Sequence, residues 1–568
     1  METLKVPSVV DAPTRPLREG LIWSAFVFFV AYLSLFMGMS LRPNVYDESL
    51  ILTGAMRVAE GQVIHRDFYA NYGPGQFYIL AGLFKLFGES LLVERLYDLF
   101  LKALIVTTIY TIVSSYGRKS IAVWTSVVAI AWLFSLHILT GTPLIPVSLL
   151  NLVASALILP AFSRSISRRR MLAAGLTGGI AALFRYDTGI ALLGVHACVI
   201  AVAVSLRTSG VVNRLRAFVS VFWSYLLGFS AVTLSAVFYY LSVSPLYPFV
   251  YDIIIYQSKH YHGARDLPFP GISLINFDDI GIYLPIAILG ISLYIVVAHR
   301  FRDRGKDAPR SQTMTEEQKW HGFLITFGLL AFVMYFKGFV RVSLLHMYLS
   351  MVPSLLLIAV LFQHRLTFSR SVRASITLLM WLFTLASGWS VLLEIVSLRV
   401  EHASVPRKIS LTAKHALPQI QATWCRTENP LTRGFCFLPD DDHIQTIEFI
   451  DSHTRPDQKL FVGLTRHDRI LENDNLTYFA TQRLPATKWS HFDPGLQNSY
   501  DIQTQMVHEL QVNAPPYIVL DSEFDQIREP NDSSKSSGVT LLDDYIHSKY
   551  QRIETYGELS IWQRMNAP

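Results

Sequence analysis

Two acidic residues, Asp47 and Glu48, stand side by side a few residues after an uncharged run that extends from Leu21 to Ser40. A carboxylate within hydrogen-bond reach of a hydroxyl can act as a general base. Asp is also a preferred N-cap residue, and acidic residues in a first turn suit the helix dipole. The local sequence therefore allows a catalytic role, a role at the start of a helix, or both.

A third acidic candidate, Asp187, occurs with Arg185 in FRYDTG, where an apolar run ends. An ion pair or a snorkelling arginine at a helix end explains such a pair equally well. If Asp187 lies on the same membrane face as Asp47 and Glu48, it joins them as a catalytic candidate, and Arg185 becomes a candidate phosphate ligand. The three carboxylates suit a divalent cation, Mg²⁺ or Mn²⁺, as an alternative. The sequence requires no cofactor.

A basic cluster follows in YFKGFVRVSLLHMY, which contains Lys337, Arg341 and His346. His346 is expected about one turn inside a span, where an ionisable residue is costly and indicates function. The arginine fork matches the oxygens of a phosphate. We therefore predict that Arg341 and His346 bind a lipid phosphate. Lys337, which fits an interfacial anchor, is expected to line the same cavity.

The tyrosine-rich segment 244–270 contains two further cations, Lys259 and Arg265. An aromatic belt with basic head-group contacts is one explanation. The other is a lid over a lipid-linked substrate, with Lys259 and Arg265 as further phosphate ligands. Asp67 and Tyr72, earlier in the chain, are expected to line the cavity.

Other polar residues in apolar runs are expected to be structural. Asp98 and Lys102 are four residues apart and can pair on one helical face. His196 is expected to be a hydrogen-bonded core histidine. No group of histidines has the spacing of a zinc site.

These residues must be positioned by membrane helices, because the chain is 51% hydrophobic and only 16% charged. Soluble proteins carry about 25% charged residues. About 20 apolar residues suffice to cross a bilayer. We predict eleven spans, at 21–40, 93–114, 120–138, 146–162, 171–184, 189–206, 217–240, 280–298, 321–338, 343–363 and 374–396.

The distribution of basic residues predicts the orientation. With residues 1–20 in the cytoplasm, the inner connections between spans, together with residues 1–20, hold 21 Lys and Arg. The outer connections, 41–76, 139–146, 185–188, 241–279 and 337–342, hold eight. This is the positive-inside bias. It accounts for most of the net charge of +6, so no nucleic-acid partner is needed. All candidate site residues then lie at the outer face.

The chain then divides into a cytoplasmic N-terminus, 1–20, a membrane module, 21–396, whose first outer loop is 41–92, and an outer tail, 397–568. The loop predicts two interfacial helices, at 48–60 and 77–87, joined by a polar turn. The tail alternates helical and strand-like runs, which predicts a small α/β domain with a partly parallel sheet. Its segment 529–538, EPNDSSKSSG, has the composition of a flexible loop. Cys425 and Cys436 are expected to form a disulfide in an oxidising compartment.

The stretch YDESLILTGAMRVAEGQVIHRDFYANYGPGQFY, together with FRYDTG and GLTRHDRILENDNLTYFATQRLPATKW, resembles the GT-C-fold glycosyltransferases. The likeness is to the bacterial branch related to protein O-mannosyltransferases and the lipid A aminoarabinose transferase. It implies a polyprenyl-phosphate sugar donor, with catalysis by an acidic residue of the first outer loop, which maps onto Asp47. YGPG replaces the His-Pro-Pro type segment of the mannosyltransferases, so the sugar and the acceptor stay open.

The resemblance implies an inverting transfer to a glycan, lipid or protein acceptor, in a bacterial inner membrane with a periplasmic tail. The alternative is a transporter or flippase of a lipid-linked or anionic substrate. Such proteins usually show related halves with interrupted spans. The sequence contains no such halves.

Overall fold

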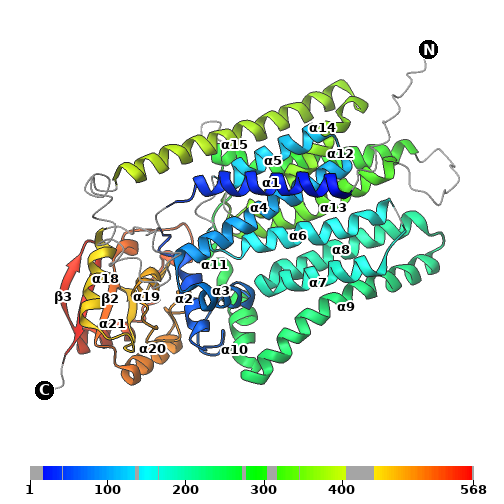
Figure 1. The fold of residues 1–568 in the computed structure, drawn as a ribbon. Helices are drawn as coiled ribbons and strands as arrows, with labels where there is room; N and C mark the ends of the chain where they lie inside the picture. Colours follow the sequence, from blue (N-terminus) through cyan, green and yellow to red (C-terminus); the bar gives the residue numbers. More distant parts are fainter. Residues whose placement is uncertain are drawn as a thin grey trace, which may run out of the picture.

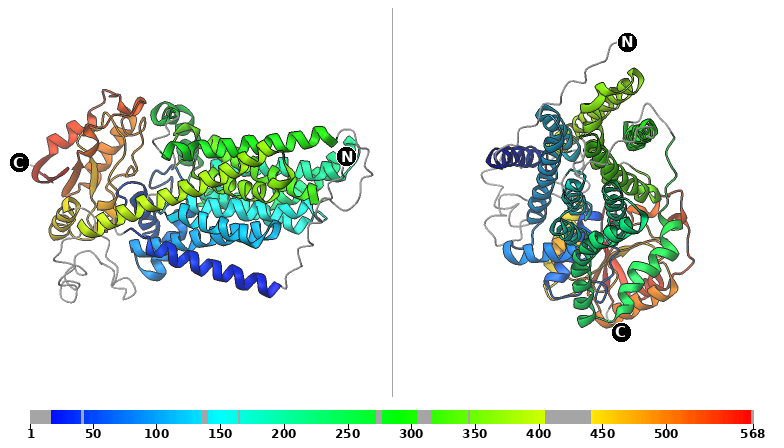
Figure 2. Two further views of the ribbon diagram at one scale, coloured as in Figure 1. Left: turned by 90° about the horizontal axis from the view of Figure 1, so that it is seen from above. Right: turned by 90° about the vertical axis from the view of Figure 1, so that its right-hand side faces the viewer.

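The computed structural model describes residues 17–40, 43–134, 140–163, 165–271, 277–303, 316–343, 346–404 and 441–565. Long helices lie side by side in a bundle, and a smaller domain with a β-sheet packs at one end of it (Figure 1). Two further views show the same arrangement (Figure 2). Cys425 and Cys436 lie outside the described residues, so their disulfide stays a prediction.

A helix occupies each of the eleven ranges predicted to be spans. Nine of the described helices are long and apolar enough to cross a membrane. The other two, α5 and α7, have 16 and 17 residues. The protein is therefore a polytopic helical membrane protein, as predicted. The bundle consists of α1 (Leu17–Met37), α4 (Leu91–Tyr116), α5 (Lys119–Phe134), α6 (Leu144–Ile158), α7 (Arg168–Phe184), α8 (Tyr186–Arg207), α9 (Val211–Val243), α12 (Phe277–Asp303), α13 (Glu316–Lys337), α14 (Tyr348–His364) and α15 (Arg370–Ser404).

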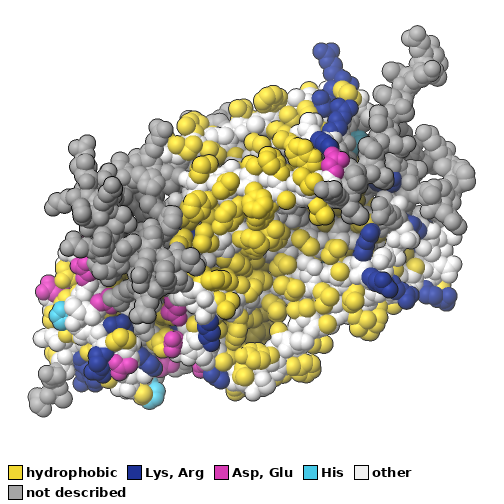
Figure 3. All heavy atoms as spheres, in the orientation of Figure 1, with side chains coloured by type: hydrophobic (Ala, Val, Ile, Leu, Met, Phe, Trp, Pro, Cys, Tyr) yellow, Lys and Arg dark blue, Asp and Glu magenta, His cyan; other side chains and the backbone are white. Residues whose placement is uncertain are grey.

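Hydrophobic side chains cover most of the bundle between its two ends on the face that Figure 3 shows. Phe29 and Leu33 of α1, for example, are 63% and 61% exposed. Such a surface suits lipid, which is as apolar as these side chains. Lys and Arg predominate at the end away from the sheet domain, whereas acidic and basic side chains mix on that domain. This distribution is the one expected if the sheet domain lies opposite the cytoplasmic face.

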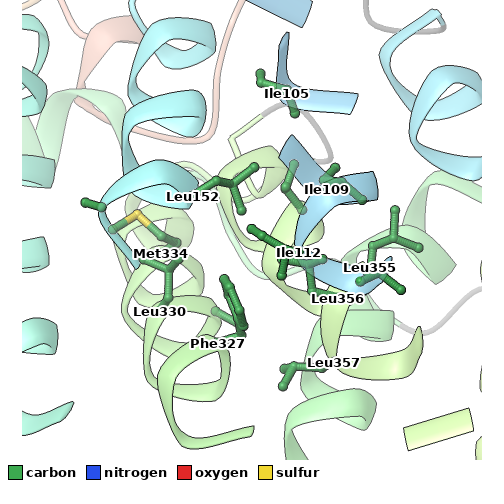
Figure 4. Close-up of a cluster of buried hydrophobic side chains, with 14 of the residues drawn as sticks. Ile105, Ile109, Ile112, Leu152, Phe327, Leu330, Met334, Leu355, Leu356 and Leu357 are labelled. Atoms are coloured by element: carbon green, nitrogen blue, oxygen red, sulfur yellow. The ribbon is translucent and has the colours of Figure 1, made fainter. Parts of the chain in front are cut away.

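Figure 4 shows part of the cluster of buried side chains at the centre of the bundle. It includes Ile105, Ile109 and Ile112 of α4, Leu152 of α6, Phe327, Leu330 and Met334 of α13, and Leu355, Leu356 and Leu357 of α14. Close approach of backbones adds to the packing. A Cβ at Gly175 of α7 would lie 2.0 Å from the carbonyl oxygen of Tyr225 in α9, so this position requires glycine.

The polar groups that we expected to be structural are paired inside the bundle. Lys102 Nζ lies 2.7 Å from Asp98 Oδ2 in α4. The ring of His196 lies within hydrogen-bond distance of Ser155 and Tyr225, at 3.1 and 3.0 Å. Both predictions are confirmed.

The first outer loop contains the two predicted helices, α2 (Asp47–Ala59) and α3 (Pro74–Phe87). The surroundings of α2 differ from the expectation of a membrane-surface helix. Its side chains from Glu48 to Val58 are all buried, and Arg57 Nη1 donates to the carbonyl of Thr487 at 3.3 Å. The polar face of α2 packs on the sheet domain instead of facing water. In contrast, α3 exposes apolar side chains, such as Leu86 at 75%.

A second outer segment runs through α10 (Leu246–Val250), the π-helical turns η3 (Tyr251–Ile255) and η4 (Gln257–Tyr261), and α11 (His262–Arg265). Tyr256 donates a hydrogen bond to the carbonyl of Pro494, at 2.9 Å. The segment is therefore anchored on the sheet domain, which an aromatic belt alone would not require.

The sheet domain has the mixed architecture predicted from its sequence. Its strands are β1 (Phe461–Leu464), β2 (Tyr517–Asp521), β3 (Tyr550–Tyr556) and β4 (Leu559–Arg564), in the order β1-β2-β4-β3. Strands β1 and β2 are parallel, with Val462 opposite Val519. Strand β4 runs antiparallel to both β2 and β3.

Helices cover both faces of this sheet: α18 (Asp441–His453), α19 (Leu476–Thr481), α20 (Tyr500–Asn513) and α21 (Leu541–Lys549). Alternate strand residues face opposite sides. Phe461 and Ile518 pack with residues of α20 and α21, whereas Val462 and Val519 pack with Ile450 of α18.

The segment 529–538 differs from the expectation of a flexible loop. It contains a short 3₁₀ helix, η8 (Asp532–Ser534). Glu529 pairs with Arg341 of the membrane module. Its polar residues form contacts between the sheet domain and the membrane module.

Candidate functional site

Asp47 is the first residue of α2, and its carboxylate does not cap the helix. The side-chain oxygen of Asn44 accepts the backbone N–H of Tyr46 at 3.0 Å and that of Asp47 at 3.1 Å. Because Asn44 supplies the cap, the N-cap explanation for Asp47 is wrong. The carboxylate of Asp47 is half-buried and available for another role.

The charges around Asp47 come from distant parts of the chain. Burial raises the pKa of Asp47, and Arg265, His491 and Arg341 act in the opposite direction. The carboxylate of Asp493 adds to the increase. The fold thus gathers the predicted base, two predicted phosphate ligands and two residues of the sheet domain.

Arg265 joins the outer segment to the sheet domain. Its Nη2 lies 2.9 Å from Asp493 Oδ1, and its Nη1 lies 3.8 Å from Glu472 Oε1. Asp493 Oδ2 also accepts a hydrogen bond from the hydroxyl of Tyr69, at 2.8 Å. The buried carboxylate of Asp493 therefore fixes the position of Arg265, and Tyr69 of the first outer loop binds the same carboxylate.

Glu472 is a second carboxylate beside Asp47 that the sequence analysis did not single out. Burial, with a further contribution from Asp47, raises the pKa of Glu472 to about 7. Its side chain keeps 32% of its surface accessible. A carboxyl group that titrates near neutral pH in an accessible position is typical of functional sites.

Two features of the sequence point to Glu472 in retrospect. It belongs to the polar run RHDRILENDN, which follows the strand-like KLFVGL. That strand, β1, is parallel to β2, and ligands of α/β sheets commonly bind at the carboxyl ends of parallel strands.

Arg341 forms a bidentate pair with Glu529 of the sheet domain. Arg341 Nη1 donates to Oε2 at 2.9 Å, and Nη2 donates to Oε1 at 2.6 Å. The predicted phosphate ligand is therefore joined to the sheet domain, and its fork holds a carboxylate. A carboxylate presents two oxygens to the guanidinium much as a phosphate does.

Asp187 lies between two cations. Its Oδ2 is 2.9 Å from Lys337 Nζ and 3.3 Å from Arg185 Nη2. The guanidinium carbon of Arg185 lies 5.4 Å from the ring centre of Tyr72, so Tyr72 contributes a cation–π contact. Asp187 is therefore better placed to hold these two cations in position than to act as a general base.

His346 is exposed and neutral, next to the same cations. Its Nδ1 lies 2.7 Å from the hydroxyl of Ser343. The surrounding protein nevertheless desolvates part of the ring, which lowers the pKa of His346 to about 3, and Arg341, Arg185 and Lys337 contribute to the decrease. A neutral imidazole can give a phosphate a hydrogen bond but no positive charge.

The remaining predicted residues lie elsewhere. Lys259 is exposed on η4. Asp67 pairs with Arg66 Nη2 at 2.7 Å and accepts the backbone N–H of Val63 at 2.7 Å. Glu48 is fully buried and pairs with Arg95 at 2.6 Å. Glu48 therefore faces away from Asp47, into the bundle.

A pair of buried residues positions the segment that carries Arg265. His65 Nδ1 lies 2.9 Å from Asp252 Oδ2, which places the first outer loop against η3. His65 has a positive φ of 66°, which is unusual for a residue with a side chain. Lys488 Nζ donates to the carbonyl of His65 at 3.0 Å, so the sheet domain contacts the same point.

The proposed metal set is not brought together. Glu48 pairs with Arg95, and Asp187 pairs with Lys337. Among the residues that the structure describes, no group of three His, Cys, Asp or Glu side chains could hold a metal ion.

Comparison with known proteins identifies the fold. No protein-family model matches the chain, and no curated protein matches its sequence. ArnT from Cupriavidus metallidurans bound to undecaprenyl phosphate matches in structure with a TM-score of 0.53 at 13% identity, over 96% of this chain and 98% of that one. The chain has the GT-C fold.

Two further structures agree with this assignment. ArnT from the same organism in the apo state gives a TM-score of 0.51 at 14% identity, over 97% of this chain and 100% of that one. The archaeal oligosaccharyltransferase AglB from Archaeoglobus fulgidus, in complex with an inhibitory peptide and a dolichol-phosphate, gives a TM-score of 0.51 at 12% identity. The match covers 96% of this chain and 75% of that one. The GT-C layout predicted from the sequence is confirmed.

Proposed function

We propose that this protein is a membrane glycosyltransferase that moves a sugar from a polyprenyl-phosphate donor to an acceptor hydroxyl. The observation that carries the proposal is that ion pairs with Asp493 and Glu529 hold Arg265 and Arg341 against the sheet domain, where both charges act on the half-buried carboxylate of Asp47. Two chains of similar fold support it, because ArnT was solved with undecaprenyl phosphate and AglB with a dolichol-phosphate.

The cations stabilise the leaving group. When the bond between the anomeric carbon and the phosphate oxygen breaks, the lipid phosphate gains negative charge. Preorganised donors aimed at such charge lower the barrier most effectively. Arg341 supplies the fork, His346 a neutral donor, and Lys337 with Arg185 a positive field that Asp187 holds in place.

Asp47 takes the proton of the acceptor. As the acceptor oxygen bonds to the anomeric carbon, its proton passes to the Asp47 carboxylate, and the polyprenyl phosphate leaves from the opposite side. A single displacement of this kind inverts the anomeric centre. Burial raises the pKa of Asp47, which makes its ionised form a better base. Glu472, with a pKa of about 7, can take over the proton at neutral pH.

The reaction is proposed to occur at the outer face of a bacterial inner membrane, with the sheet domain in the periplasm. The acceptor is a glycan, a lipid or a protein. A reporter that is active only in the cytoplasm, fused after Pro568, should be inactive. Activity of that reporter would place the site on the cytoplasmic face.

The experiment that tests the function uses the full chain in lipid nanodiscs and polyprenyl-phosphate sugars with a radiolabelled sugar. We expect release of polyprenyl phosphate and transfer of the label to an envelope acceptor, with inversion visible by NMR of the product. A parallel assay in sealed vesicles follows movement of the intact lipid. Movement of the lipid without cleavage would overturn the proposal in favour of a flippase.

A further inference from the structure

One segment of the sheet domain lies directly across the candidate site. Residues 523–534, here called the strap, follow β2 and include η7 (Glu523–Asp525) and η8. The hydroxyl of Tyr46, the neighbour of Asp47, donates to the carboxylate of Glu523. Asn531 Nδ2 donates to the carbonyl of Asp266 at 3.1 Å. The strap thus contacts both outer segments that carry site residues.

The central contact of the strap is the bidentate pair between Glu529 and Arg341. Asn531 Nδ2 also donates to Glu529 Oε2, at 2.9 Å. Although burial acts in the opposite direction, the hydrogen bonds from Arg341 and Asn531 lower the pKa of Glu529, so it is ionised at neutral pH. Glu529 therefore places one negative charge and two oxygens where the proposed donor phosphate would bind.

The pair between Arg265 and Asp493 is different. Asp493 is 1% exposed, and Tyr69 donates to it as well. The side chains of Glu529 and Arg341 are 15% and 19% exposed. Apart from its two short 3₁₀ turns, the strap has no regular structure, and segments of this kind open at low cost. The Arg341 pair is thus the one suited to exchange.

The equal charges of the donor phosphate and Glu529 allow such an exchange when the donor binds. A donor phosphodiester carries one negative charge, as Glu529 does, whereas the polyprenyl phosphate left after transfer is a monoester that carries nearly two at neutral pH. Arg341 would be costly to leave unpaired in a partly buried position. A carboxylate that returns to Arg341 as the phosphate leaves removes this cost.

We propose that Glu529 is an exchange ligand that trades places with the lipid phosphate on Arg341. The strap opens when the donor binds, and it closes when the product leaves. Because Tyr46 is bonded to the same strap, opening also clears the approach to Asp47. This inference rests on the proposed function, and its tests separate the two.

The first test measures binding of polyprenyl phosphate to the full chain in nanodiscs, with polyprenol as the control without phosphate. Glu529→Gln removes the competing charge and should tighten binding by about three- to tenfold, as expected for a charge pair of modest strength. Both kcat and KM should fall, because the product is held longer. The matched control is Asp532→Asn, which removes an exposed strap carboxylate that pairs with Lys535 and should change nothing.

The outcomes distinguish the inference from the function. Unchanged or weaker binding by Glu529→Gln, with weaker binding by Arg341→Ala, would show that Glu529 is a fixed bridge and would overturn the exchange. No response to either variant would overturn the assignment of Arg341 to the donor phosphate itself.

A second test locks the strap. A Cβ at Gly263 would lie 2.9 Å from Asp532 Oδ2, so Gly263→Cys with Asp532→Cys can form a disulfide across the closed strap. Polyprenyl phosphate binding should be lost on oxidation and restored by a reductant that leaves the parent chain unaffected. Full binding by the oxidised, cross-linked protein would overturn the exchange.

Discussion

The guanidinium of Arg95 contacts both carboxylate oxygens of Glu48, with Nε 2.6 Å from Oε1 and Nη2 2.8 Å from Oε2. Both side chains are buried. The backbone N–H of Asn44 donates to the same carboxylate at 2.8 Å, and the side chain of Asn44 caps α2 at Asp47. A helix of the membrane module thereby fixes the turn from which Asp47 projects.

This relationship predicts a structural cost for the loss of Glu48. Glu48→Ala removes a bidentate partner of the buried Arg95, whose Nε also lies 3.8 Å from Glu94 Oε2. Breaking a buried ion pair from one side typically lowers the free energy of unfolding by about 3–5 kcal/mol. Glu48→Gln keeps the shape and should be milder. Thermal unfolding in detergent measures both. The double variant Glu48→Gln with Arg95→Gln should regain part of the loss, because the buried charge of Arg95 is removed as well. Wild-type stability of Glu48→Ala would contradict the positioning role.

The elevated pKa of Glu472 predicts how stability depends on pH. The pKa rises from 4.5 in the unfolded chain to about 7 in the folded protein. Between these values the folded protein holds a proton that the unfolded chain has lost, so the free energy of unfolding falls as pH increases through this window.

Melting temperatures at pH 5 and pH 8 check this dependence. The difference in melting temperature between pH 5 and pH 8 should be smaller for Glu472→Gln than for the parent chain. Some dependence should persist, because burial also raises the pKa of Asp521 to about 7. An unaltered pH dependence in Glu472→Gln would mean that Glu472 titrates like an ordinary exposed carboxyl group.

The phosphate assignment predicts different results for two substitutions of Arg341. Arg341→Ala should weaken donor binding by about tenfold or more, because hydrogen bonds to charged groups contribute about 1.5–3 kcal/mol. Arg341→Lys should bind the donor more tightly than Arg341→Ala but more weakly than the parent chain, since the planar fork is lost. Isothermal titration with a polyprenyl-phosphate sugar measures both. Full recovery by lysine would indicate a point charge as the sole requirement.

The comparison of sequence and fold is most informative at Asp47 and Glu48. Uncharged runs and strand alternation predicted the bundle and the mixed sheet, because these depend on local patterns. The two acidic residues look alike in sequence. On a helix, consecutive side chains point about 100° apart. One therefore faces the site and the other enters the bundle.

The sheet-domain residues of the site could not be predicted in the same way. Glu472, Asp493 and Glu529 contact residues about 190 or more positions away. Such pairs depend on how two parts of the chain dock. The same docking explains why the polar face of α2 is buried, although its periodicity is that of a surface helix.

Asp47 provides the most direct test of the proposed chemistry. Because Asn44 caps α2, Asp47→Asn removes a negative charge without removing the cap or changing the side-chain shape. The variant should insert and unfold like the parent chain. Loss of a general base typically slows a reaction by about two to four orders of magnitude, so we expect transfer at least about a hundredfold slower.

The matched control is Glu60→Gln, at the exposed far end of α2, which changes charge by the same amount and should leave the rate unaltered. Donor binding by Asp47→Asn should be retained or tightened, since a negative charge near Arg265 and Arg341 is removed. This combination, intact binding with slow transfer, is expected of a base and not of a residue that merely holds the loop. Near-normal transfer by Asp47→Asn would contradict the assignment of Asp47 as the base. Glu472, the other carboxylate at the site, would then be the next candidate.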